Sequence, residues 1–160
     1  MSKLTVIDLI RHGEPVGGRR YRGQQDDPLS EKGWQQMTAA VNGYSSWQQI
    51  VTSPLKRCRD FAVVLGQQLN IPAQDEPRFK EIGFGEWEGR TPDELRRADP
   101  AQLTRFYHDP ITHRPKGSED PHVFVDRVVT ACQELLTNYA GQHVLVVAHA
   151  GVIRAVIGYV

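Results

Sequence analysis

Two short apolar runs, one near each end of the chain, constrain its fold most strongly. Residues 4–10 form a nearly continuous apolar run rich in β-branched side chains, and residues 144–148 form a second apolar run. Runs of this length and composition are typical of strands that are buried on both faces, as they are in parallel sheets. Asp8 is the polar exception, and the sequence alone indicates no partner for it.

Segments with helical signals alternate with strand-like segments between these two runs. Ser30 is expected to cap a helix that extends to Val41, and Ser53 with Pro54 is expected to begin a helix over residues 55–69. Further helices are expected at 92–98, 100–107, 123–139 and from 151 to the end, with short strands at 49–52 and 71–74. Residues 13–28, 77–90 and 109–121 are expected to be loops. The alternation predicts an α/β fold, a three-layer α/β/α sandwich with a mostly parallel sheet, in one domain over residues 1–160.

Composition limits the partners and the compartment. The formal net charge is zero at pH 7, whereas general binders of nucleic acid or membrane surfaces normally carry a basic excess, so both partners are disfavoured. Cys58 and Cys132 are too few and too far apart for a disulfide framework, and we expect both to be reduced in a cytoplasmic protein. The start of the sequence has neither a signal-peptide pattern nor a membrane span. No cluster of His, Cys, Asp and Glu has metal-ligand spacing, so neither a metal nor another cofactor is expected.

Both apolar runs end in a histidine with a glycine close behind. Arg11, His12 and Gly13 follow the first run, and His149 and Gly151 follow the second. Ligands of parallel sheets bind beyond the carboxyl ends of the strands, so His12 and His149 are expected to meet in one crevice if both strands are central. Imidazole can act as a neutral nucleophile near pH 7 or as a cationic phosphate ligand. The four other histidines are expected to lie in solvent: His108, His113, His122 and His143.

A second basic group follows the strand expected at residues 49–52. Arg57 lies in the first turns of the next helix, whose N-terminus favours an anion. Arginine binds phosphate oxygens bidentately and stays charged, which makes Arg57 and Arg11 candidate phosphate ligands. Lys56 and Arg59 are expected on the exposed face of the helix.

Five blocks of the sequence resemble, in the same order, those of the histidine phosphatase superfamily, also called phosphoglycerate-mutase-like. They are residues 11–14, 27–33, 53–58, 81–89 and 149–154, so the resemblance covers nearly the whole chain. It implies that His12 becomes phosphorylated and that Arg11, Arg57 and His149 form the phosphate pocket. It also implies that Glu81 protonates the leaving oxygen and that no metal takes part.

The role implied for Glu81 is chemically consistent. The leaving alkoxide needs a proton in the first step and the incoming water loses one in the second, so one carboxyl group with a raised pKa can serve both steps. Glu14, Glu86 and Glu88 are competing carboxylates. Glu81 ranks first because of its position in the family block.

The loop after His12 departs from the family pattern. Many relatives have Thr or Ser after the first block and then an Asn that helps to hold the phosphate, whereas this chain has Pro15 and Gly18. Arg19, Arg20 or Arg22 are candidates to replace the missing donor, and we include Arg22 among the substrate-binding residues. A solvated basic loop is an equally favoured interpretation.

The resemblance also indicates a substrate. Residues 8–14, 17–23 and 33–37 are most similar to bacterial α-ribazole-5′-phosphate phosphatases, which act in cobalamin nucleotide-loop assembly. The expected partner is therefore a small phosphorylated metabolite. A broad-specificity phosphatase, a phosphoglycerate mutase and a non-catalytic phospholigand-binding module are the alternatives, although mutases of this family are longer.

The last segment of the sequence shows helical spacing of apolar residues. Val152, Ile153, Val156, Ile157 and Val160 predict a core-facing helix. Because relatives continue beyond it, usually with another strand, we expect that a C-terminal strand or helix is missing. The exposed sheet edge would then favour self-association, and the oligomeric state stays open.

Overall fold

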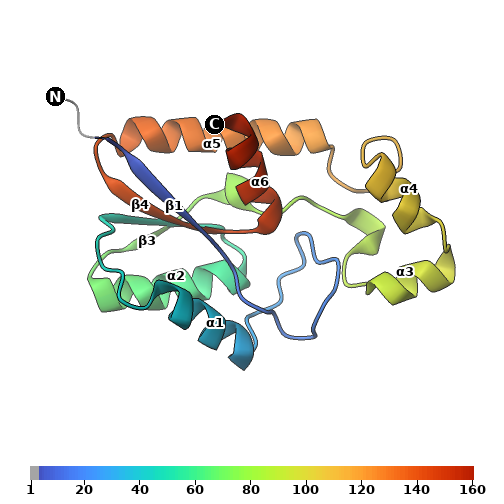
Figure 1. The fold of residues 1–160 in the computed structure, drawn as a ribbon, viewed down its shortest axis with the longest axis horizontal. Helices are drawn as coiled ribbons and strands as arrows, with labels where there is room; N and C mark the ends of the chain where they lie inside the picture. The colour runs from blue at the N-terminus through green and yellow to red at the C-terminus, as the bar shows by residue number, and fades with distance from the viewer. Residues whose placement is uncertain (1–3) are drawn as a thin grey trace.

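The computed structural model describes residues 4–160 and has the predicted alternation of strands and helices (Figure 1). The strands are β1 (Val6–Arg11), β2 (Gln49–Thr52), β3 (Ala73–Asp75) and β4 (His143–Ala148). The helices are α1 (Glu31–Val41), α2 (Lys56–Leu69), α3 (Pro92–Ala98), α4 (Gln102–His108), α5 (Pro121–Asn138) and α6 (Ala150–Tyr159). Two short 3₁₀ turns, Pro77–Phe79 and Gly85–Trp87, interrupt the segment between β3 and α3.

The four strands form one parallel sheet in the order β1-β4-β2-β3. β4 lies inside the sheet, whereas β1 lies at an edge of it within the described residues, so the condition that both strands are central is not met. The register nevertheless pairs Arg11 with Ala148, and the backbone N–H of His12 donates to the Ala148 carbonyl at 3.1 Å. His12 and His149 therefore leave the sheet side by side.

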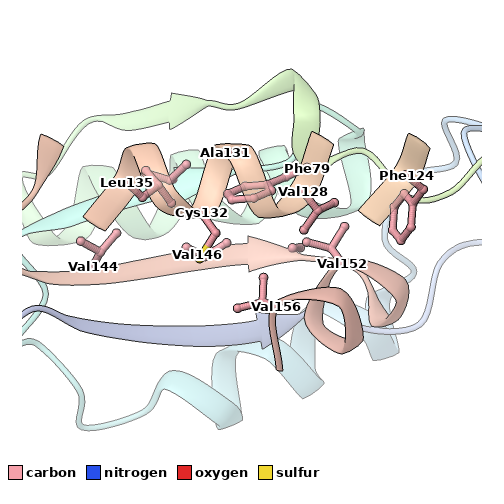
Figure 2. Close-up of a cluster of buried hydrophobic side chains, with 12 residues drawn as sticks. Phe79, Phe124, Val128, Ala131, Cys132, Leu135, Val144, Val146, Val152 and Val156 are labelled. Carbon is pink, nitrogen blue, oxygen red and sulfur yellow. The ribbon is translucent and has the colours of Figure 1, made fainter. Parts of the chain in front are cut away.

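The sheet is covered on both faces, which confirms the three-layer α/β/α prediction (Figure 1). Alternate side chains of β4 enter different apolar clusters, because successive residues of a strand point to opposite faces. Val144 and Val146 pack with α5 and α6, as Figure 2 shows, whereas Leu145 and Val147 pack with α1 and α2. Burial on both faces explains why this strand is apolar from Val144 to Ala148.

The two helices predicted to have serine caps begin differently. Ser30 caps α1 as predicted, and its hydroxyl accepts a hydrogen bond from the Gly33 N–H at 3.0 Å. The helix after β2 begins at Lys56 with Leu55 at the cap position, so the prediction that Ser53 caps it is wrong. The Ser53 hydroxyl accepts from the Leu55 N–H at 3.3 Å and also pairs with the imidazole of His149.

Asp8 has two partners at the amino end of the sheet. Its carboxylate accepts hydrogen bonds from Trp47 Nε1 at 2.7 Å and from His143 Nε2 at 2.8 Å. These contacts explain the polar residue within the apolar run of β1. They also correct the expectation that His143 lies free in solvent, whereas His108, His113 and His122 are exposed.

The final helix buries one stripe of its apolar residues. Val152 and Val156 are buried against the sheet and α5. Ile157 and Val160 are 62% and 89% exposed, so the prediction of a core-facing segment is wrong for these two residues. Each helix within residues 4–160 is either too short or too polar to span a lipid bilayer.

Candidate active site

A cavity of about 960 Å³ opens beyond the carboxyl ends of the strands. The loop after β1, the segment after β3, helices α3 to α5 with their connections, and the first turns of α6 all contribute residues to its wall. Most of the candidate site residues lie on this wall: Arg11, His12, Arg22, Arg57 and Glu81. The chain topology thus brings segments that are distant in sequence to one concave site.

His12 is held as a neutral imidazole. Its Nδ1 lies 2.8 Å from the Gly13 carbonyl oxygen, and because a carbonyl can only accept, Nδ1 carries the proton and Nε2 keeps a lone pair. Burial lowers the pKa of His12 to about 4, with further lowering by Arg57. A Cβ at Gly13 would collide with the backbone of Gly33, so glycine is required where this loop passes α1.

Arg57 places a buried positive charge beside that lone pair. Its Nε lies 3.4 Å from Nε2 of His12, and its two Nη atoms donate to the carbonyls of Gln25 and Gly23, each at 2.7 Å. The side chain is buried, and no carboxylate in residues 4–160 forms an ion pair with it. Because guanidinium groups stay protonated in proteins, an uncompensated cation faces the nucleophilic nitrogen.

His149 packs behind His12 and does not line the cavity. The two rings meet edge to face, with centroids 5.2 Å apart, and His149 is fully buried. Burial, reinforced by the charge of Arg57, lowers the pKa of His149 well below its usual value. Its Nε2 lies 2.7 Å from the Ser53 hydroxyl. His149 is therefore a buried neighbour of the His12 ring, and its predicted place in the phosphate pocket stays a prediction.

Glu81 approaches the site from the segment after β3. Its carboxylate accepts hydrogen bonds from the backbone N–H groups of Ile82 and Gly151, both at 3.1 Å. Burial raises the pKa of Glu81, and these hydrogen bonds only partly oppose that effect. A Cβ at Gly151 would collide with Oε1 of Glu81, so the glycine makes room for the carboxylate. A buried carboxyl group with a raised pKa can hold the proton that a leaving oxygen needs.

The comparisons with known proteins identify the family of the chain. Residues 7–160 match the family model of the histidine phosphatase superfamily (branch 1). The chain belongs to this superfamily. The family and fold implied by the sequence resemblance are thereby confirmed.

Three relatives of this superfamily member show how far the likeness extends. A bifunctional protein of Mycobacterium tuberculosis is 34% identical over 94% of this chain, which spans only 42% of that protein's length. A glucosyl-3-phosphoglycerate phosphatase of Mycolicibacterium vanbaalenii is 33% identical over 96% of this chain and 72% of its own length. The solved α-ribazole phosphatase of Shigella flexneri has a TM-score of 0.80 at 27% identity, covering 96% of this chain and 78% of that one.

The competing carboxylates of this superfamily member occupy other places. Glu14 lines the cavity but forms an ion pair with Lys32 at 2.9 Å. Glu88 accepts hydrogen bonds from backbone N–H groups in two loops, and Glu86 is exposed and outside the cavity wall. Glu81 is thus the one of the four that both lines the cavity and is held by the first turn of α6.

The arginines after His12 divide into two kinds. Arg22 is buried and fastens the loop: its Nε pairs with Asp27 at 2.9 Å, and its Nη2 donates to the carbonyls of Val16 and Gly18 at 2.8 and 2.6 Å. Arg19 is exposed and forms no ion pair within the described part of the chain. Gly18, where many relatives have Asn, therefore contributes its carbonyl to a contact that holds the loop.

Sequence reasoning missed two parts of the site. Ser53 was expected to cap a helix, yet it is the partner of His149, and Gly151 was expected to admit a ligand, yet it makes room for Glu81. The only available signal was that each lies in a family block beside a candidate residue. Among residues 4–160, no group of three or more His, Cys, Asp and Glu side chains is placed to hold a metal ion.

Proposed function

We propose that this chain hydrolyses small phosphomonoesters through a phosphohistidine formed at Nε2 of His12. The contact of Arg57 with His12 is the observation that carries the proposal: a neutral imidazole lone pair lies 3.4 Å from a buried guanidinium that has no carboxylate partner in residues 4–160. A phosphoryl group bound at this nitrogen would lie against a fixed positive charge. Such preorganised charge is usually the largest contribution to catalysis.

The first step transfers the phosphoryl group to the enzyme. The lone pair of His12 Nε2 attacks phosphorus, the bond from phosphorus to the ester oxygen breaks, and Glu81 donates its proton to that oxygen. The Gly13 carbonyl keeps the Nδ1 proton in place while the ring becomes cationic. Arg57 and Arg11 stabilise the charge on the phosphoryl oxygens.

The second step returns the enzyme to its starting state. A water molecule attacks phosphorus, the Glu81 carboxylate accepts its proton, and the bond to Nε2 breaks to release inorganic phosphate and neutral His12. One carboxyl group serves both steps because the burial that raises its pKa suits a group that gains and loses a proton.

Two groups of substrates are candidates. α-Ribazole 5′-phosphate is supported by the sequence resemblance and by the fold shared with the Shigella flexneri enzyme. Phosphorylated carboxylic acids are supported by the higher identity to a mycobacterial glucosyl-3-phosphoglycerate phosphatase, 30% against 27% between the solved structures. A panel of α-ribazole 5′-phosphate, phosphoglycerates and sugar phosphates separates the two groups by their kcat/KM values.

The proposal is tested by phosphate release from p-nitrophenyl phosphate in excess EDTA. We expect sustained turnover, since the arginines supply the positive charge. Activity that is lost in EDTA and restored by zinc or magnesium would contradict a metal-independent mechanism, and no release at all would favour a phospholigand-binding module. Formation of 2-phosphoglycerate from 3-phosphoglycerate with 2,3-bisphosphoglycerate would indicate a mutase instead.

A further inference from the structure

The cavity wall carries more positive charge than one phosphoryl group can neutralise. Two of its arginines are paired, Arg22 with Asp27 and Arg114 with Asp120. The others form no ion pair with a carboxylate anywhere in residues 4–160: Arg11, Arg19, Arg20, Arg57 and Arg154. A phosphate dianion held by Arg11 and Arg57 leaves the remaining charge unbalanced.

The acidic residues of the wall do not neutralise this excess. Glu14 is paired with Lys32, and Glu119 is paired with Arg127 at 2.7 Å. Glu81 is the remaining carboxyl group of the wall, and its burial disfavours the negative form. The cavity therefore offers a cationic site to a second negative group on the ligand.

Arg154 lies in the same helix as the backbone group that holds Glu81. It follows Gly151 by three residues in α6, and this spacing places both residues on one face of the helix. The Gly151 N–H binds the carboxylate of Glu81, the proposed proton donor to the leaving oxygen. Burial is the main cause of the raised pKa of Glu81, and the positive charge of Arg154 is one of the effects that lower it. The two side chains therefore interact electrostatically.

The side chain of Arg154 forms no ion pair or hydrogen bond within the described chain. Its side chain is exposed on the cavity wall and donates no hydrogen bond there. Arg127 on the neighbouring helix α5 differs in both respects. Its guanidinium binds both carboxylate oxygens of Glu119 and backbone carbonyls of the segment after β3. It does not line the cavity. A free guanidinium beside the acid is suited to bind a ligand.

We propose that Arg154 binds a carboxylate on the leaving alcohol, so that the substrate class is a phosphorylated carboxylic acid. A planar carboxylate matches a single guanidinium in shape and in charge. This inference rests on the proposed function, since it places the carboxylate on the group that departs past Glu81. It ranks phosphorylated acids above α-ribazole 5′-phosphate, which has no carboxylate.

A matched pair of substrates tests the inference. 3-Phosphoglycerate and glycerol 3-phosphate share the same phosphate ester and differ in a carboxylate against a hydroxymethyl group. We expect the wild-type kcat/KM to favour 3-phosphoglycerate by about tenfold or more, the effect of one hydrogen bond to a charged group. The ratio should fall close to one in Arg154→Gln and to an intermediate value in Arg154→Lys, which keeps the charge without the planar fork.

The controls separate this inference from the proposed function. Arg97→Gln alters an exposed arginine of α3 outside the cavity wall and should leave the ratio and both rates unchanged.

A wild-type ratio in Arg154→Gln, or a wild-type enzyme that cleaves both esters equally well, would overturn the carboxylate site while leaving the phosphatase activity intact. A wild-type enzyme that cleaves neither ester nor p-nitrophenyl phosphate would contradict the proposed function itself. If Arg154→Gln does not fold, an unchanged ratio in Arg154→Lys overturns the carboxylate site and a reduced ratio supports it.

Discussion

The inner and outer parts of the cavity are built in different ways. In the inner part, His12, Arg57 and Glu81 are each held by hydrogen bonds to backbone groups. In the outer part, Arg19 and Arg154 are exposed and form no ion pair within residues 4–160. Fixed groups suit chemistry, because preorganised charge needs no rearrangement during the reaction, whereas the exposed arginines are accessible to a ligand that arrives from solvent.

The wall farthest from the sheet belongs to the outer part. Helices α3 and α4 lie apart from the strands (Figure 1) and share a small apolar core with the 3₁₀ turn at Gly85–Trp87. The Tyr21 and Tyr107 hydroxyls form a hydrogen bond that joins the loop after β1 to α4. This wall contributes the aromatic residues Phe106 and Tyr107 to the cavity but none of the groups proposed for the phosphoryl transfer.

The largest effect is expected from His12→Ala, which removes the nucleophile of the inner part. Turnover should fall on the order of 10⁶-fold, as it does when other enzymes lose a nucleophile. The fold should survive, because His12 packs at the end of a strand, and circular dichroism would check this. His108→Ala, on an exposed histidine outside the cavity wall, is the matched control. Full activity in His12→Ala would refute the assignment of the nucleophile.

Glu81→Gln should separate substrates by their leaving groups. The variant keeps the shape of the side chain but cannot donate the proton, so hydrolysis of an alkyl phosphate should slow by roughly 10²–10⁴-fold and that of p-nitrophenyl phosphate far less. Glu86→Gln changes an exposed carboxylate of the same segment and serves as the control. Equal losses on alkyl and aryl esters would mean that Glu81 has a different role.

Arg57→Gln should reduce kcat by roughly 10²–10³-fold, the usual cost of removing one preorganised charge donor. Its neighbour Arg59, on the exposed face of α2 in an ion pair with Asp75, offers a matched Arg59→Gln control with little expected change. Because Arg57 also holds the Gly23 and Gln25 carbonyls, a thermal melt should accompany the kinetics. A change in KM alone would indicate that Arg57 binds substrate without stabilising the transition state.

The smallest effect concerns pH. Burial lowers the pKa of His12 to about 4, so the nucleophile stays neutral until the pH falls to about 4 and activity drops below it. Burial raises the pKa of Glu81, so the proton donor is lost only at a pH above the ordinary value of 4.5. The kcat/KM for an alkyl phosphate should therefore rise and then fall with pH. In Glu81→Gln the falling limb should disappear, and a falling limb that persists would have another origin.

The parts of the site that follow strand ends were predictable from sequence. An apolar run followed by Arg11, His12 and Gly13 identifies a strand that ends at a ligand site, and β4 with His149 repeats this pattern. The prediction that both runs are buried on both faces holds for β4 but is wrong for β1, which is only partly buried because it lies at an edge of the sheet. The parallel α/β sandwich follows from the same alternation. These inferences rest on local periodicity, which a single sequence displays directly.

The remaining contacts depend on residues that are distant in sequence. Arg57 binds carbonyls of a loop that lies 32 and 34 positions earlier, and Asp8 meets His143 across 135 positions. Ser53 has the sequence of a helix cap, but a buried imidazole competes for its hydroxyl. The exposure of Ile157 depends on where α6 crosses its neighbours. Local sequence patterns do not determine contacts between distant residues or the packing of one helix against its neighbours.

The central claim is that the phosphoryl group passes through His12, and trapping the intermediate tests it most directly. The enzyme is mixed with a ³²P-labelled phosphomonoester, quenched in alkaline denaturant within one turnover, digested, and mapped by mass spectrometry. We predict an acid-labile label on the peptide that contains His12, and none in His12→Ala. An acid-stable label, a label on another residue, or full turnover by the wild-type enzyme without any covalent label would contradict the account.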